Sequence, residues 1–250
     1  VCSSDLKKLI LLLLAGFLVL AFGGNASASL LWESDYGTWS DLSEEDDDSE
    51  EYSLGFDFVF YGQSYNSVYV NSNGALHFDD SDDTDDYEVG DDIEDGYDPT
   101  IASFWADLDP DEGGDIYYNT LGSSGNMRFV VTWDDVYDYE EEFYNTFQVI
   151  LFENGLIQFG YQQLNGSGDD DGEDVIGVSQ GDGTHFTYFI AADGNENGIY
   201  PDGQNLFFNW NPVTLNYDMT ASTAPVPEPT TILLFGLGIL GFAGVSRRKK

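Results

Sequence analysis

The sequence predicts an all-β protein: an antiparallel β-sandwich-like domain between an N-terminal signal peptide and a short, apolar C-terminal helix. Segments of alternating apolar and polar residues recur through the middle of the chain, separated by turn residues. Between the two ends, no stretch shows a helical period with capping residues. Aromatic residues make up 16% of the chain, which is enough apolar area to close a core.

The first 28 residues have the three parts of a secretory signal. Lys7 and Lys8 give a positive start, an apolar run follows at residues 9–22, and Ala26 and Ala28 form an A-x-A cleavage site. We expect cleavage after Ala28. A permanent N-terminal membrane anchor is the alternative, although the run is shorter than the ~20 residues that a span needs.

Composition limits the chemistry of the mature protein. The sole cysteine, Cys2, lies in the segment expected to be removed, which excludes disulfides, thiolate metal sites and cysteine nucleophiles from the rest. Between Ser29 and Val226 lie 45 of the 47 acidic residues and one basic residue, Arg128. This charge repels nucleic acid and anionic membrane surfaces, so neither is expected as a partner. Self-repulsion also favours a salty or calcium-containing medium, which screens the charges.

An acidic stretch at residues 41–51 has no apolar period, so we expect a flexible leader or a solvated loop before the domain. The expected organisation has five segments: signal peptide 1–28, acidic leader 29–51, β domain 52–211, linker 212–226 and C-terminal signal 227–250.

The first expected strands show a period of two. Phe56, Phe58 and Phe60 alternate with polar or smaller residues in FDFVFYG. The stretch SVYVNSNGALHF places Asn73 and Gly74 between two short strands, which is a strong hairpin signal.

Two further hairpins follow, each with one apolar face. Gly and Ser residues form the turn of the first, and residues 153–155 form the turn of the second, before a strand at residues 156–161. The residues expected to face the core are Met127, Phe129, Val131 and Trp133, then Phe147, Val149 and Leu151. The segments VIGVSQ, HFTYFIAA and NLFFNW complete the expected strands.

The C-terminal helix is too short for a stable anchor. Residues 232–245 give a helix of about 21 Å, whereas the hydrocarbon core of a bilayer is ~30 Å thick. Pro227 and Pro229 keep the preceding segment extended, as a protease substrate requires. Four basic residues at 247–250 would hold the helix end on the cytoplasmic side.

This layout resembles the PEP-CTERM sorting signal of Gram-negative bacteria: Val226, Pro227, Glu228 and Pro229, then a glycine-rich apolar helix and a basic tail. The resemblance implies export through the inner membrane and a transient stay there. It also implies recognition by the membrane enzyme exosortase, which cuts near Pro-Glu-Pro and delivers the protein to the cell surface or extracellular space. It associates the protein with biofilm and exopolysaccharide. An ordinary single-span anchor remains the alternative.

The β segments resemble nidogen-like domains. VYVNSNGALHF, IASFWADLD, FVVTWDDV, NTFQVILFENGLIQFGY and VIGVSQGDG occur in the order found in those extracellular modules. The resemblance implies an adhesive or matrix role, with extracellular polysaccharide or matrix and surface proteins as partners. It supplies no catalytic residues.

Two segments are candidates for calcium. Asp193, Asn195 and Asn197 stand at positions 1, 3 and 5 of a calcium loop with Gly198 at position 6, although Gln204 replaces the usual Glu. A polar hairpin loop explains the same residues. The second segment lacks the glycine, has Glu112 in its place, and offers Asp107, Asp109, Asp111 and Asp115. A third acidic stretch, residues 79–95, is expected to be a solvated insertion between strands, and weak binding of several cations there is the alternative.

No catalytic motif stands out. With so many acids, carboxylate pairs arise by chance, so a polysaccharide hydrolase is a rival hypothesis without a specific signal. His77 and His185 are both expected on strands, where a structural role is common. Arg128 is expected in a cross-strand ion pair, with contact to the carboxylate of a ligand as the alternative. A passive surface-coat protein is the third hypothesis.

Overall fold

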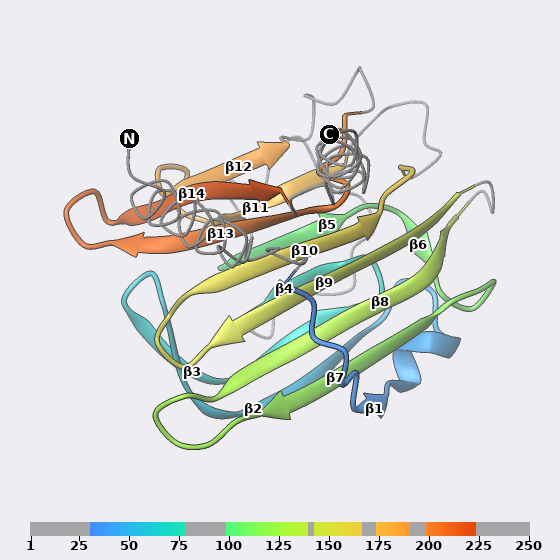
Figure 1. Ribbon diagram of the computed structural model, residues 1–250, viewed down its shortest axis with the longest axis horizontal. Helices are drawn as coiled ribbons and strands as arrows, with labels where there is room; N and C mark the ends of the chain where they lie inside the picture. Colours follow the sequence, from blue (N-terminus) through green and yellow to red (C-terminus); the bar gives the residue numbers. More distant parts are fainter. Residues whose placement is uncertain (1–30, 79–98, 140–142, 167–173, 191–198, 224–250) are drawn as a thin grey trace, which may run out of the picture. The chain divides into compact units, whose positions relative to one another are not determined.

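The computed structural model describes residues 31–78, 99–139, 143–166, 174–190 and 199–223. These residues form two antiparallel sheets that face each other (Figure 1), which confirms the predicted all-β class. Outside the described residues lie the expected signal peptide, the acidic insertion at 79–95, the candidate ligands Asp193, Asn195 and Asn197, and the C-terminal signal. None of the described helices is long and apolar enough to cross a membrane.

Sheet A runs in the order β1-β7-β8-β9-β10-β13-β14, and β6 pairs with β8. Its strands are β1 Thr38–Trp39, β6 Leu108–Asp109, β7 Asp115–Leu121, β8 Arg128–Asp138, β9 Tyr144–Phe152, β10 Ile157–Gln163, β13 Gln204–Asn211 and β14 Asn216–Thr223.

Sheet B runs in the order β12-β11-β5-β4-β3-β2, and its strands β2–β5 lie behind β7–β10 in the view of Figure 1. Its strands are β2 Ser49–Phe60, β3 Gln63–Asn71, β4 Ala75–His77, β5 Thr100–Trp105, β11 Val175–Ser179 and β12 Phe186–Ile190.

The core lies between the sheets and is rich in aromatic rings. The predicted core faces of β2, β8 and β9 are confirmed, because Phe58, Phe60, Trp133 and Phe147 are fully buried there. The rings of Trp133 and Phe147 stack with centroids 4.8 Å apart. Burial of each such side chain contributes about 1.5–3 kcal/mol relative to exposure in water.

The Asn73-Gly74 hairpin is confirmed and also joins the two sheets. Gly74 has a φ of +88°, and a Cβ there would lie 2.0 Å from the carbonyl oxygen of Phe104, so only glycine fits. The buried Asn73 side chain accepts a hydrogen bond from Leu108 N at 2.7 Å and donates one to Asp47 at 2.9 Å. The turn motif therefore fixes tertiary contacts as well as the strand pairing.

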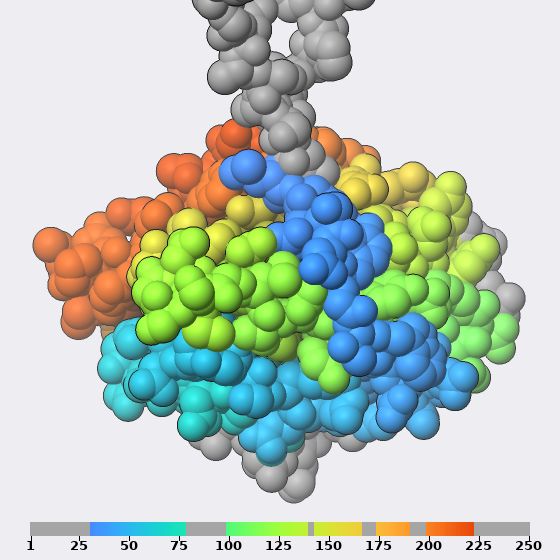
Figure 2. Space-filling model, turned by 60° about the horizontal axis from the view of Figure 1, so that its bottom comes forward, coloured from blue at the N-terminus to red at the C-terminus, as the bar shows by residue number. Residues whose placement is uncertain are grey.

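The expected leader is folded, so the prediction of a flexible segment is wrong. A 3-10 turn, Asp41–Glu44, buries Leu42 in the core, and the strand β2 begins within the expected leader at Ser49. Before this turn, residues 31–39 form what we term the N-terminal strap, which crosses sheet A (blue over green and yellow in Figure 2). The Gln148 side chain accepts a hydrogen bond from Glu33 N at 2.9 Å, and Asn119 donates one to Asp35 O at 3.0 Å.

The domain also extends further at its C-terminal side than expected. Residues 212–226 are predicted as a linker, but β14 occupies Asn216–Thr223 and pairs with β13 at eight positions, from Asn211–Asn216 to Gln204–Thr223. Its sequence lacks a strong alternating pattern because the strand lies at a sheet edge, where few side chains reach the core.

Candidate functional site

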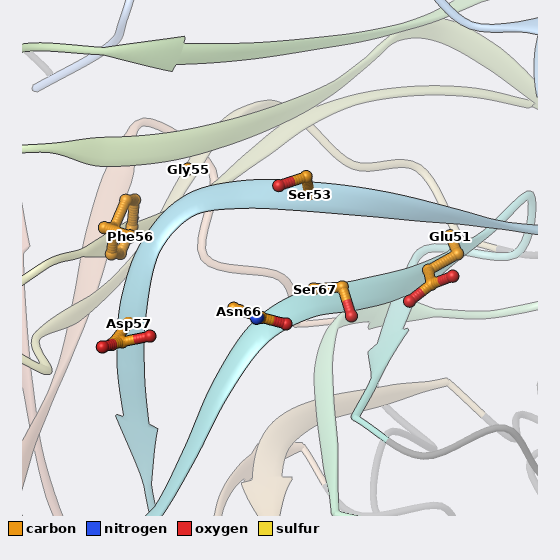
Figure 3. Close-up of a pocket in the computed structure, with 7 residues that line it drawn as sticks. All are labelled: Glu51, Ser53, Gly55, Phe56, Asp57, Asn66 and Ser67. Atoms are coloured by element: carbon orange, nitrogen blue, oxygen red, sulfur yellow. The ribbon is translucent and has the colours of Figure 1, made fainter.

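A gap between β2 and β3 in the described part of the chain forms a surface hollow that is larger than two others, one beside Asp107 and one beside Arg128. The two strands pair from Ser49–Asn71 to Ser53–Ser67, and pairing resumes only at Phe58–Tyr65. Four residues of β2 therefore lie opposite Asn66 alone. Figure 3 shows β2 bending away from β3 at Gly55 and Phe56.

The bend follows from contacts with sheet A. Gly55 has a φ of +78°, a conformation that glycine adopts at little cost. Next to it, Leu54 O accepts a hydrogen bond from the Thr120 hydroxyl of β7 at 3.2 Å. The middle of β2 therefore turns toward the facing sheet, and the space that it leaves beside β3 opens to solvent.

This gap, which we call the β2–β3 cleft, has a volume of about 630 Å³. Its lining residues are Glu51, Ser53, Gly55, Phe56, Asp57, Asn66 and Ser67. All except the buried Phe56 are at least partly exposed, and Figure 3 shows Asp57 and Asn66 on facing strands. No feature of the sequence pattern indicates the cleft, because it depends on where two paired strands separate.

The lining favours one class of ligand. Carboxylate oxygens of Glu51 and Asp57 accept hydrogen bonds, whereas the Asn66 amide and the serine hydroxyls can both donate and accept. Such a surface suits a ligand with many hydroxyl groups and repels an anion. Both carboxylates are exposed, whereas the general acid of a glycosidase centre lies in an apolar pocket.

The four predicted calcium ligands of the second segment do not meet. Asp115 accepts hydrogen bonds from the Trp39 indole at 2.8 Å and the Tyr117 hydroxyl at 3.1 Å, which ties it to the strap. Asp109 accepts one from Glu112 N at 3.3 Å. Nowhere in the described ranges do three or more His, Cys, Asp or Glu side chains come close enough to hold a metal ion.

Asp107 instead lines a hollow with two residues of the former leader. Asp46, Asp47, Asp107 and Tyr139 surround a volume of about 310 Å³. Burial, followed by repulsion from Asp47 and Asp109, raises the pKa of Asp46 to about 6. Sequence reasoning missed this cluster because it treated Asp46 and Asp47 as part of a solvated leader.

Arg128 forms an ion pair, but not with a neighbouring strand as expected. Its Nε donates to Glu33 of the strap at 3.1 Å, and its terminal nitrogen contacts the same carboxylate oxygen. Burial by itself raises the pKa of Glu33, but hydrogen bonds from Arg128 and from Asp35 N, with the arginine charge, bring it below its ordinary value. A third hollow, about 330 Å³ in volume, lies beside this pair.

The two histidines have separate surroundings. His77 lies on β4 as predicted, is 1% exposed, and its Nδ1 lies 3.1 Å from the Thr100 hydroxyl. Burial lowers the pKa of His77 to about 4. His185 precedes β12 rather than lying on it, and its Nδ1 is 2.7 Å from an Asp182 carboxylate oxygen. The same nitrogen lies 3.0 Å from the Thr184 hydroxyl, so each histidine has a threonine hydroxyl within hydrogen-bond distance.

Comparison with known proteins identifies both parts of the chain. A family model described as NIDO related matches residues 26–223, and a model of the PEP-CTERM protein-sorting motif matches residues 225–249. Alpha-tectorin of Mus musculus is 28% identical over 166 residues, which is 54% of this chain and 7% of that protein. Alpha-tectorin of Homo sapiens is 27% identical over 166 residues, which again is 54% of this chain and 7% of that protein. The chain thus spans 7% of the length of these curated relatives.

No solved structure matches the chain significantly. The NIDO-related model, however, covers the whole described sandwich and most of the chain. The protein therefore belongs to the NIDO-related family, and a PEP-CTERM protein-sorting motif follows its β domain.

Proposed function

We propose that this protein is an exported substrate of exosortase that works at the cell surface or in the extracellular matrix of a Gram-negative bacterium, in an adhesive role within biofilm or exopolysaccharide. One observation carries the proposal: a NIDO-related domain ends at residue 223 and a PEP-CTERM motif begins at residue 225. The acidic body is consistent with a role outside the cell, where salt and divalent cations screen its charge.

Processing would separate the two parts. The enzyme breaks one peptide C–N bond near Pro227, Glu228 and Pro229. The acyl group then passes to water, which releases the protein, or to an acceptor amine, which attaches it, and the tail leaves with a new amino terminus. Mass spectrometry of the protein from the cell surface tests this step, because it determines both chain ends. An intact tail on the mature surface protein would overturn the proposal.

We further propose that the β2–β3 cleft binds a neutral, hydroxyl-rich polysaccharide. Support comes from its exposed carboxylates, amide and hydroxyls, which accept and donate hydrogen bonds to sugar hydroxyls. In titration calorimetry, the purified β domain should bind a neutral exopolysaccharide and should not bind an anionic one. Asp57→Asn combined with Ser67→Ala should weaken this binding roughly tenfold, the effect of losing about 1.4 kcal/mol.

A matched control lies on the same strand. Ser64 is exposed on β3 but does not line the cleft, so Ser64→Ala should bind as the wild type does. Equal binding by the cleft variant and the wild type would place the ligand elsewhere. Cleavage of the polysaccharide that depends on Glu51 or Asp57 would favour the rival hydrolase. Self-association without any polysaccharide binding would favour a passive coat protein.

A further inference from the structure

The turn between β13 and β14 presents two apolar side chains to solvent. Val213 is 88% exposed and Leu215 is 54% exposed. We call residues 211–217 the β13–β14 tip, and none of these residues is charged. Figure 1 shows the tip extending past the neighbouring ends of β8, β9 and β10. Single exposed apolar residues are common, but a pair on a protruding turn forms a patch that another molecule can cover.

Hydrogen bonds hold the tip in one conformation, so both side chains stay outside. The side-chain oxygen of Asn211 accepts a hydrogen bond from Val213 N at 3.0 Å, and its carbonyl accepts one from Leu215 N at 2.9 Å. Leu215 has a φ of +56°, a left-handed conformation that glycine or asparagine adopts at lower cost. Turn chemistry by itself therefore does not account for a leucine at this position.

A hollow of matching character lies on the outer face of the same sheet. This strap hollow, the one of about 330 Å³ beside Arg128, is lined mainly by apolar side chains of the strap and of β9: Leu31, Trp32, Ile150 and Phe152. Two polar lining groups already have partners within the chain, since Arg128 pairs with Glu33 and Gln158 donates to Leu31 O. The volume is within the range of ligand pockets and admits two aliphatic side chains.

The tip does not fill the strap hollow of its own chain. Gln158, which lines the hollow, pairs with Phe207 of β13, four residues before Asn211. At about 3.3 Å per residue, the tip begins about 13 Å further along the sheet. Neither Val213 nor Leu215 lines the hollow, and both remain exposed.

We propose that the β13–β14 tip of one copy of this chain inserts Val213 and Leu215 into the strap hollow of a second copy. The two surfaces differ, so the contact joins a tip to a hollow rather than two tips. None of these residues lines the β2–β3 cleft, and the contact requires neither processing by exosortase nor a polysaccharide.

The distribution of charge favours a second copy as the occupant. With 45 acids and one basic residue between Ser29 and Val226, two copies repel each other wherever their acids meet. The tip is uncharged, and in the hollow Arg128 offsets the charge of Glu33. These two surfaces can therefore meet with little repulsion, while burial of their apolar side chains supplies the attraction.

Disulfide trapping of the full chain tests this contact. In a Cys2→Ser background, one chain carries Leu215→Cys and a differently tagged chain carries Leu31→Cys. After co-expression in an exporting host and oxidation, the two should form a mixed disulfide dimer, because a seated tip lies against Leu31. Neither chain should form a disulfide dimer when expressed alone. Dimers of either single variant, or the absence of the mixed dimer, would overturn the inference.

Sedimentation of the full chain in neutral detergent micelles measures the strength of association. Val213→Ser with Leu215→Asn should raise the dissociation constant by roughly tenfold or more, and should not lower the melting temperature, because asparagine suits the φ of position 215. The control Tyr139→Ser removes a side chain that is 60% exposed just past the opposite end of β8, and should associate as the wild type does. A monomeric wild type, or equal dissociation constants for the tip variant and the wild type, would contradict the proposal. Failure of the cleft to bind polysaccharide would leave these results unchanged.

Discussion

His77 is a buried, neutral side chain whose ionisation opposes folding. Its surroundings include the Trp105 ring, whose centroid lies 5.2 Å away in an edge-on arrangement. Arg128 is the one lysine or arginine among the described residues. Burial of the imidazole is the sole cause that lowers the pKa of His77 to about 4. The unfolded chain binds this proton near pH 6.5, so the native state loses stability as the pH falls from 6.5 toward 4.

We predict that His77→Gln removes this part of the pH dependence. Between pH 7 and pH 5, the wild type should lose about 2 kcal/mol more unfolding free energy than the variant, as a difference between pKa values of 6.5 and about 4 implies. Urea denaturation at several pH values measures it. Parallel curves for the two proteins would contradict the assignment.

Asp46 makes stability depend on pH in the opposite direction: the native state gains stability as the pH falls. Burial and the neighbouring carboxylates raise its pKa to about 6, above the ordinary 3.8, so its negative charge destabilises the native state at neutral pH. This penalty is present above pH 6 and disappears as the pH falls toward 4.

Asp46→Asn should therefore raise the melting temperature at pH 7 and have no effect below about pH 4. Because the side chain is largely exposed, solvent screening keeps the gain small. Asp57→Asn, which replaces an exposed acid that is not among the charges acting on Asp46, serves as the control. A gain that stays constant with pH would exclude repulsion as the cause.

At the scale of single elements, the β3–β4 hairpin depends on one glycine. Gly74 and Gly62 both have positive φ, at +88° and +81°, but only Gly74 has backbone atoms where a Cβ would lie. Gly74→Ala should destabilise the protein by roughly 3 kcal/mol or more, through strain and displacement of Phe104. Gly62→Ala should cost only about 1 kcal/mol, because nothing lies within 4 Å of its Cβ. Equal losses in thermal unfolding would show that the close approach is relieved elsewhere.

The attachment of the N-terminal strap to sheet A depends on Arg128, the one basic residue between Ser29 and Val226. Arg128→Met should destabilise the protein by about 1–3 kcal/mol, because the partly buried Glu33 carboxylate then lacks its partner. Glu33→Gln in the same chain should recover much of this loss. A double-mutant cycle by urea denaturation measures the coupling, and strictly additive losses would mean that the pair does not interact.

For the whole molecule, charge dominates the response to ions. Sodium chloride should raise the melting temperature, because it screens repulsion among 45 acids. We propose that calcium acts in addition through the loop with Asp193, Asn195 and Asn197. A site with a Kd of about 10⁻⁴–10⁻³ M, typical of extracellular modules, would add roughly 1.4–2.7 kcal/mol at 10 mM calcium.

Calorimetry in matched ionic strength separates the two effects. Replacing Asp193, Asn195 and Asn197 with alanine should abolish the calcium-specific gain, whereas Asp107→Asn with Asp109→Asn should leave it unchanged. Equal melting temperatures in calcium and in sodium at matched ionic strength would mean that screening is the whole effect.

The sequence by itself determined the features that depend on near neighbours in the chain. The alternation of Phe56, Phe58 and Phe60 specifies a strand with one buried face, because side chains of a strand alternate every residue. The Asn73-Gly74 pair specifies a hairpin, because glycine tolerates the positive φ of the turn. The C-terminal sorting motif is a contiguous run of residues, so it can be identified from the sequence without knowledge of the fold.

Only the tertiary structure decided the features made by distant segments. The acidic leader folds because Glu33 meets Arg128 and Leu42 enters the core, contacts that no local period reveals. The edge strand β14 forms because β13 offers it a ladder of backbone partners, whatever its own pattern. The β2–β3 cleft opens where Leu54 bonds to Thr120 in the facing sheet. In each case the stabilising contact joins residues that are far apart in the chain. Local sequence patterns carry no information about such contacts.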